Sequence, residues 1–423
     1  MTSKQEPISR RSYLKYVGGG VVAVAAAAAG YYYGMGAQPQ PAQPVTQTTA
    51  ITETAVQTVT AKKRYKWGLS PYYIDDDWYR VDIIGAQYYA DDNNYDLIVQ
   101  NPHGNIESQI KDIRNMVSGF GAQGIITCAT DPTLADTLKW AHDKGVAIVP
   151  TFYEFDAGSD TIDCTLLTDK ATTGKNMAKV TVDAAKADGV EAKGPVFIVT
   201  GPKSDYQSVI LTGNQEEVFK DYPDLKVVEF ECPTWGTDEA VKRVVDAFHA
   251  YGKPFAICGN NMTVSIGVVE GMKTAGIAVP RGQAGHVYCA TFDGAQQIQD
   301  YMKEGLVDSF SESPNPHIDC LAQEICRIIK EKGVDGLPKA GTKVISDPSK
   351  PDGAQNDGTY NIVLRANDHK GKNPWALAPW APCTMIEHTG HLQLSIPQAT
   401  ITRDKLDAYA KVHWTQLVNA WLA

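Results

Sequence analysis

Hydrophobic and polar residues alternate in two patterns from Tyr65 to about residue 332. Short apolar runs, such as Leu97 to Val99 and Val196 to Thr200, have the length and composition of buried strands. Between these runs, apolar residues recur every three or four positions, which is typical of the inner face of an amphipathic helix. Repeated alternation of strands and helices predicts an α/β fold built on parallel sheets.

The alternation occurs in two successive series of similar size, which predict two similar lobes with a ligand cleft between them. The first series begins at residue 65 and the second follows about residue 169. The strands expected in the first lobe are 65–69, 97–99, 124–128 and 147–152, and a hairpin-like run covers 161–167. The strands expected in the second lobe are 196–200, 226–231, 255–258, 287–291 and 307–310.

The segment from Trp67 to Asn101 reads as strand, loop, helix and strand. Its loop is rich in aromatic and acidic residues, including Tyr72, Tyr73 and the run Asp75 to Tyr79. In a parallel sheet, the loop after such a strand lies at the carboxyl edge, where these sheets bind ligands. Aromatic rings beside carboxylates at that edge suit a polyhydroxylated small molecule.

The alternation stops after Lys339. Residues 346–373 are dense in Pro, Gly, Asp and Asn, which predicts a loop, and Thr402 is expected to begin a terminal helix. Apolar residues of that helix include Leu406 and Tyr409, and we expect its apolar face to dock on the body. Residues 346–423 are therefore expected to be a C-terminal extension with a loop and a terminal helix.

The first 64 residues indicate export. Residues 9–15 resemble a twin-arginine signal, and the uncharged segment from Val17 to Ala37 is long enough to cross a bilayer. We expect residues 1–37 to be a signal or a membrane anchor, and the sequence leaves cleavage open. Residues 38–64 are rich in Thr, Pro and Gln and are expected to be a flexible stalk. The protein is therefore expected outside the cytoplasm, in the periplasm or at the cell surface.

Net charge and cysteine content bear on the partners of the protein and on the state of its thiols. The chain has a net charge of −10 with its acidic excess after residue 64, which argues against nucleic acid as a partner. The eight cysteines form no CxxC pair. Disulfides in an exported protein and scattered buried thiols are both compatible with this pattern.

Several short motifs, taken in order, carry a family resemblance. They are Trp78-Tyr79 leading into Gly85 to Ala90, Gln109 to Ile113, Thr130 to Pro132, Asn260-Asn261, and Phe292 to Gly294. From Lys66 to about Lys339 the sequence resembles the ribose-binding-like solute receptors of ABC importers, which are type I periplasmic binding proteins. The resemblance implies two Rossmann-like lobes, joined by a three-crossing hinge, that close over one sugar-like ligand. The N-terminal lobe would consist of residues 65–168 plus about 313–345, and the C-terminal lobe of residues 169–312.

The resemblance also implies a set of ligand-binding residues. Trp78 and Tyr79 would stack on one face of a sugar ring, and Trp235 would close from the other lobe. The polar ligand residues would be Asp76, Tyr153, Glu154, Asn260 or Asn261, Asp293 and Glu312. This chain has Tyr153-Glu154 where the family has Asp-Arg, and it has no arginine near Ile210. Recognition is thus expected to rely on carboxylates and amides, and a sugar, a polyol or a cationic solute stays possible.

Each of these residues also has a structural interpretation. Trp78 is compatible with a core position, Asp293 with a turn, and Asn261 with a helix cap. The acidic run Asp75 to Asp77 is compatible with a solvated surface or a cation site. A C-terminal group of possible metal ligands consists of Cys383, Glu387, His388 and His391. Neither group has the spacing of a known metal motif, so we expect no metal and no cofactor.

These features favour a non-enzymatic receptor that captures a carbohydrate or polyol and delivers it to ABC permease subunits. One alternative is a ligand-sensing ectodomain without a transport role. A second alternative, an exported oxidoreductase, requires a glycine-rich turn after the first strand. That turn is Ser70 to Tyr73 and contains no glycine.

Overall fold

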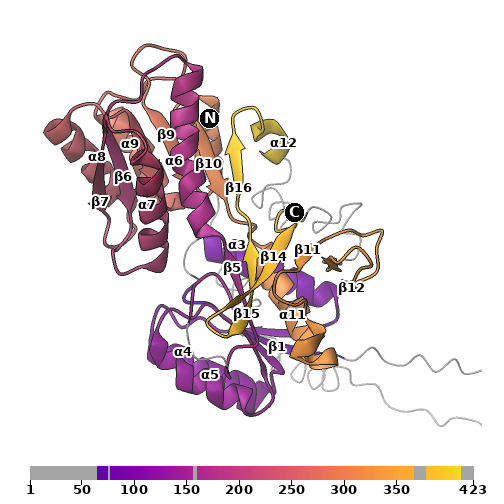
Figure 1. Cartoon of the computed structure of the whole chain (residues 1–423). Helices are drawn as coiled ribbons and strands as arrows, with labels where there is room; N and C mark the ends of the chain where they lie inside the picture. The colour runs from indigo at the N-terminus through magenta and orange to yellow at the C-terminus, as the bar shows by residue number, and fades with distance from the viewer. Residues whose placement is uncertain (1–63, 75–76, 156–159, 366–377, 411–423) are drawn as a thin grey trace, which may run out of the picture. The chain divides into compact units, whose positions relative to one another are not determined.

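The computed structural model describes residues 64–74, 77–155, 160–365 and 378–410. In these ranges, strands and helices alternate and build two α/β lobes, each around a parallel sheet (Figure 1). The predicted α/β fold with two lobes built on parallel sheets is confirmed.

The N-terminal lobe contains a parallel sheet with strand order β2-β1-β3-β4. Helices α3 and α11 cover one face and bury Trp67, Leu69 and Ile126, while α4 and α5 cover the other face and bury Ile125 and Ile148. The strands are β1 (Lys66–Ser70), β2 (Asp96–Val99), β3 (Gly124–Thr127) and β4 (Ala147–Pro150). The helices are α3 (Asp77–Asp92), α4 (Ile106–Asn115), α5 (Ala135–His142) and α11 (His317–Lys332), with short turns η1 (Met116–Phe120), η2 (Pro132–Leu134) and η3 (Val334–Gly336).

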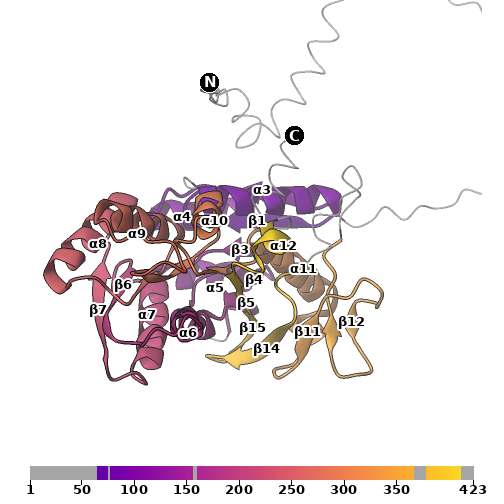
Figure 2. The same ribbon diagram turned by 90° about the horizontal axis from the view of Figure 1, so that it is seen from above.

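The C-terminal lobe contains five parallel strands in the order β10-β9-β8-β6-β7. Figure 2 shows α6 and α7 on one side of this sheet and α8 and α9 on the other. The strands are β6 (Gly194–Thr200), β7 (Leu225–Glu231), β8 (Ala256–Gly259), β9 (Tyr288–Phe292) and β10 (Ser309–Glu312). The helices are α6 (Lys170–Ala187), α7 (Tyr206–Phe219), α8 (Thr237–Tyr251), α9 (Met262–Thr274) and α10 (Gln296–Lys303).

The C-terminal part of the chain joins both lobes instead of forming only a loop and a helix. Strands β14 and β15 form a hairpin, and β15 pairs in parallel with β5, which also bridges to the end of β4. Strand β16 then adds an antiparallel edge to β10 in the other lobe (Figure 1). These elements are β5 (Cys164–Thr168), β11 (Lys343–Ile345), β12 (Gly353–Ala354), β13 (Tyr360–Asn361), β14 (Cys383–His388), β15 (His391–Ile396), β16 (Ala399–Thr402) and α12 (Leu406–Ala410). The run 161–167 is thus not a hairpin, because its partner strand comes from the distant C-terminal part.

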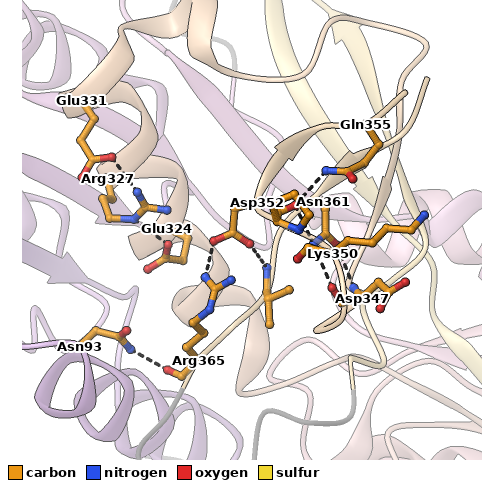
Figure 3. Close-up of polar contacts among 12 residues, drawn as sticks. Asn93, Glu324, Arg327, Glu331, Asp347, Lys350, Asp352, Gln355, Asn361 and Arg365 are labelled. Carbon is orange, nitrogen blue, oxygen red and sulfur yellow. Dashed lines mark hydrogen bonds and ion pairs between the residues drawn. The ribbon is translucent and has the colours of Figure 1, made fainter. Parts of the chain in front are cut away.

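A polar network orders residues 347–365 and ties them to Asn93, which follows α3 (Figure 3). Arg365 forms an ion pair with Asp352, and the backbone carbonyl of Arg365 accepts a hydrogen bond from Asn93 Nδ2 at 2.8 Å. The side chain of Asn361 is fully buried and donates to the carbonyls of Asp347 and Lys350. The segment expected as a loop is therefore ordered by specific hydrogen bonds.

Three chain crossings join the lobes: β5 to α6, β10 to α11, and β15 to β16. The buried side chain of Gln398, in the last crossing, donates to Ser313 Oγ at 2.6 Å and accepts from Thr173 Oγ1 at 2.8 Å. Because Ser313 belongs to the second crossing and Thr173 to the helix after the first, Gln398 links all three.

All eight cysteines are buried free thiols. Of the two alternatives, disulfides and scattered buried thiols, the structure therefore shows the second. Within the described ranges, no helix is both long and apolar enough to cross a membrane, and the uncharged segment 17–37 lies outside those ranges. The same ranges contain no group of three or more His, Cys, Asp or Glu residues placed to hold a metal ion.

Candidate ligand-binding cleft

A cavity of about 340 Å³ lies where the carboxyl ends of the strands of the two lobes face each other. Its volume falls in the range of small-molecule sites. The lining residues follow strand ends in both sheets or belong to the chain crossings, which is the position that parallel sheets use for ligands. They are Tyr73, Trp78, Tyr79, Phe152, Tyr153, Thr168, Lys170, Gln207, Thr234, Trp235, Gly236, Thr237, Asn261, Met262, Thr263, Phe292, Asp293 and Ser313.

An aromatic wall forms the N-terminal side of this cavity. The rings of Trp78 and Phe152 meet edge to face, with centroids 4.8 Å apart, and Tyr79 contacts Trp78 at 4.9 Å and Tyr73 at 4.8 Å. Tyr79 itself is 5% exposed, and its hydroxyl lies 3.4 Å from Cys128 Sγ. Trp78 is held by α3 and by Asn315, whose Nδ2 donates to the Trp78 carbonyl at 2.9 Å. Trp78 is only partly buried and is therefore more accessible than Tyr79 and Phe152.

Trp235 forms the aromatic surface of the C-terminal side. Its backbone has φ of 57°, in the left-handed region that a bulky side chain rarely adopts. The indole lies against Gly201, where a Cβ added to the glycine would approach Trp235 Cε2 to 2.1 Å. Glycine after β6 therefore leaves room for the ring, and the strained backbone directs the indole into the cleft.

Two more cavity residues share this backbone conformation: Phe152 has φ of 68° and Asp293 has φ of 59°. Strained non-glycine residues of this kind cluster at functional sites because the surrounding structure has to hold them there. At Asp293, the Gly294 N–H donates to Glu312 Oε2 at 2.7 Å, and the Asp293 N–H donates to the Ser311 carbonyl. Glu312 is buried and does not line the cavity, so its contact is with the turn that presents Asp293.

The two neighbouring asparagines after β8 have different environments. Asn261 lines the cavity and caps α9, with its Oδ1 accepting from the Thr263 N–H at 2.8 Å. Asn260 is fully buried and exchanges hydrogen bonds with Gln215 at 2.7 and 3.2 Å, away from the cavity. The structure therefore places Asn261, rather than Asn260, where a ligand can be reached.

The remaining expected ligand residues lie at the edge of the cleft or outside the described residues. Tyr153 lines the cavity, whereas the carboxylate of Glu154 contacts the imidazole Nε2 of His388 at the end of β14. Burial and then the Glu154 carboxylate raise the pKa of Tyr206, on the other lobe. Asp76 lies outside the described residues.

Sequence reasoning missed seven polar residues of the cavity that are not aromatic: Thr168, Lys170, Gln207, Thr234, Thr237, Thr263 and Ser313. Lys170 is the first residue of α6, and its ammonium donates to the Phe152 carbonyl at 2.9 Å and to Thr168 Oγ1 at 3.1 Å. One signal was available in the sequence, because a lysine at a helix N-terminus faces the positive end of the helix dipole. A lysine at this position lowers the stability of the fold, which indicates a role other than stabilising the helix.

The electrostatic environment of Lys170 is unusual. Burial lowers the pKa of Lys170 to about 8, although the nearby Asp205 and other acidic groups favour the charged form. The side chain is 5% exposed and lies 5.9 Å from the ring of Tyr153 and 5.8 Å from that of Tyr206. The cavity therefore combines aromatic surfaces, a carboxylate, amides, hydroxyls and one buried ammonium, which together match a ligand with several hydroxyl groups.

This fold and cleft define a class of two-lobed solute receptors. The chain belongs to the periplasmic binding protein domain family, whose sequence profile matches residues 67–318. The resemblance to type I periplasmic binding proteins is thus confirmed, and the family consists of binding proteins rather than enzymes.

Individual relatives are distant. A xylitol-binding protein from Mycolicibacterium smegmatis is 23% identical over 45% of this chain and 53% of its own length. The D-xylose-binding periplasmic protein of Escherichia coli is 24% identical over 43% of this chain and 54% of its own length. The chain thus spans about half the length of the curated relatives it matches.

Solved structures show the same fold. An ABC transporter periplasmic solute-binding protein from Actinobacillus succinogenes, with bound D-allose, has a TM-score of 0.60 at 18% identity, over 82% of this chain and 100% of that chain. A solute-binding protein from Bacillus halodurans, with bound myo-inositol, has a TM-score of 0.59 at 13% identity, over 84% of this chain and 100% of that chain.

Proposed function

We propose that this protein is an extracytoplasmic solute-binding protein that captures a sugar or related polyol between its lobes and delivers it to an ABC transporter. The single observation that carries the proposal is the pairing of aromatic surfaces across the cavity. Trp78 faces it from one lobe and Trp235 from the other, with Asp293 and Asn261 beside them. Aromatic faces suit the apolar C–H faces of a sugar, while carboxylates and amides bind its hydroxyls.

Transport requires the receptor to lie outside the cytoplasm and to meet a permease. Family membership supports an exported, periplasmic location. We propose that the twin-arginine-like segment in residues 1–37 directs export or anchors the chain. Residues 38–64 would act as a spacer, and the closed lobes would present the ligand to the permease subunits.

Calorimetric titration of the full-length protein tests ligand capture. The panel consists of D-xylose, xylitol, D-glucose, D-allose and myo-inositol, and we expect at least one dissociation constant in the micromolar range or below. Trp78→Ala and Trp235→Ala are each expected to weaken that binding by tenfold or more, which corresponds to about 1.4 kcal/mol or more.

Trp140→Ala is the matched control, because Trp140 lies on α5, packs against Arg114 and Lys144, and does not line the cavity. Its thermal unfolding, recorded with that of the other variants, separates lost binding from lost folding. Absence of binding to every panel member at millimolar concentration would contradict the proposed function.

A further inference from the structure

Lys170 is a buried cation in the wall of the cleft, at the crossing from β5 to α6. Its side chain lines the cavity but is only 5% exposed. Two hydrogen bonds, to the Phe152 carbonyl and to Thr168 Oγ1, fix the ammonium. A lysine ammonium has three N–H donors, and among the described residues two of them have acceptors, so the third can donate to a molecule in the cavity.

Fold stability alone does not account for this charge. Dehydrating an ammonium is costly, and the N-terminus of α6 adds an unfavourable dipole. The hydrogen bonds to Phe152 and Thr168 offset part of that cost. They also connect the two lobes, because Lys170 begins α6 of the C-terminal lobe while Phe152 and Thr168 belong to the N-terminal lobe. A side chain held charged and immobile in this way is pre-organised for recognition.

The charges of three carboxylates act on the Lys170 ammonium. Asp205, Asp293 and Glu154 are close enough for their charges to act on Lys170, and Asp293 lines the cavity with it. Asp205 caps α7 and Glu154 contacts His388, so both are held in place by neighbouring groups. The surroundings of the cavity therefore contain one buried ammonium and more than one carboxylate.

Resting on the proposed function, we propose that Lys170 is the specificity-determining residue that restricts this cleft to uncharged polyhydroxylated ligands. A cationic solute would bring a second positive charge next to a buried ammonium. An anionic sugar acid would meet the carboxylates that already compensate Lys170. A neutral hydroxyl can accept from the Lys170 ammonium and donate to the Asp293 carboxylate without adding a charge to the cavity.

A matched ligand set tests this assignment in the full-length protein. D-glucose, D-glucosamine and D-glucuronate share one ring and differ in charge, and D-xylose, xylitol and D-xylonate form a second set. Calorimetry at pH 7 is carried out on the wild type, Lys170→Met, Lys170→Gln and Lys179→Met. Lys179 lies on the exposed face of α6 and serves as the control.

The wild type is expected to bind neutral members at least tenfold more tightly than charged members. Lys170→Met is expected to weaken neutral binding by tenfold or more and to reduce discrimination against D-glucosamine by a similar factor. Lys170→Gln keeps a donor without the charge, so it should recover part of the neutral binding but not the discrimination. Lys179→Met is expected to match the wild type.

Two results would overturn the assignment while leaving the proposed function intact. One is tighter wild-type binding of a charged member than of every neutral member. The other is unchanged discrimination in Lys170→Met, with thermal unfolding showing a folded variant. Absence of wild-type binding to all members would instead overturn both the assignment and the proposed function.

Discussion

At the scale of single residues, the cleft contains residues whose backbone conformation or buried charge is unfavourable in free energy. Trp235, Phe152 and Asp293 adopt left-handed backbone conformations, and Lys170 carries its charge at a position that is only 5% exposed to solvent. Each of these states costs free energy that the surrounding fold has to supply. Their concentration around one cavity is the physical sign that the cavity is functional.

Gly201→Ala tests how Trp235 is positioned. The added methyl group would overlap the indole, so the ring has to move, and we expect ligand affinity to fall by about tenfold, or about 1.4 kcal/mol. Gly213→Ala is the control, because Gly213 lies on the exposed surface of α7 with nothing within 4 Å of the added methyl. Equal dissociation constants for the two variants by calorimetry would contradict this role of Gly201.

Lys170→Met tests the cost of the buried charge. The pKa of Lys170 is about 8 in the folded protein against an ordinary value of 10.5, so the protonated form destabilises the fold by ~3 kcal/mol below pH 8. This cost disappears as the pH rises from 8 to 10.5, because the folded lysine loses its proton while the unfolded lysine keeps it. The wild type should therefore gain ~3 kcal/mol of unfolding free energy relative to Lys170→Met between pH 7 and pH 10.5.

Urea unfolding of both proteins across this pH range measures the difference, and the comparison cancels groups that titrate alike in both. The lost hydrogen bonds to Phe152 and Thr168 contribute a difference in stability that does not depend on pH. Lys179→Met, at an exposed site of the same helix, should keep a constant difference from the wild type. A constant difference for Lys170→Met as well would show that its charge carries no folding cost.

At the scale of elements, the hinge brings together chain segments that lie far apart in the sequence and joins them by hydrogen bonds. The three crossings run side by side, and the Asp169 N–H donates to the Ile396 carbonyl at 2.8 Å. Gln398 adds side-chain bonds to Ser313 and Thr173. Because Ser313 and Thr168 also line the cavity, the hinge and the ligand site share residues. A ligand in the proposed site would therefore contact the segments that connect the lobes.

Gln398→Ala is expected to destabilise the protein by about 1–3 kcal/mol, because the buried hydrogen bonds of Gln398 to Ser313 and Thr173 are lost at once. Chemical denaturation followed by circular dichroism measures the change. Gln283→Ala, at an exposed position of the C-terminal lobe, should stay within about 0.5 kcal/mol of the wild type. If Gln398→Ala behaves like Gln283→Ala, the side chain of Gln398 is not a hinge clamp.

At the scale of the whole molecule, the C-terminal part of the chain completes both lobes. Leu394 and Ile396 of β15 are fully buried in the core around α3 and α11, and Ile401 of β16 is buried in the other lobe. Without β15 and β16, β5 and β10 would present open edges and these cores would lose apolar cover. The folding unit therefore extends beyond the residues matched by the family profile.

Leu394→Ala tests this dependence. Leu394 is 0% exposed, so its truncation leaves a cavity and should cost about 2–5 kcal/mol of unfolding free energy. Leu392→Ala, two residues earlier on the same strand and only partly buried, should cost clearly less. Thermal and urea unfolding of both variants provide the comparison. Equal and small losses would show that the C-terminal strands are dispensable for the N-terminal lobe.

The sequence by itself determined the alternation of strands and helices from β1 to α11, because each element has its own local hydrophobic period. It also determined that Trp78, Trp235 and Asp293 follow strands, and parallel strands bring their carboxyl ends to one edge. Only the tertiary structure decided which strand pairs with β5 and β10, since backbone hydrogen bonding does not depend on side-chain identity and β15 and β16 lie far away in the chain. It likewise decided between Asn260 and Asn261 and brought Lys170 into the cleft, because the direction and surroundings of a side chain depend on elements from both lobes.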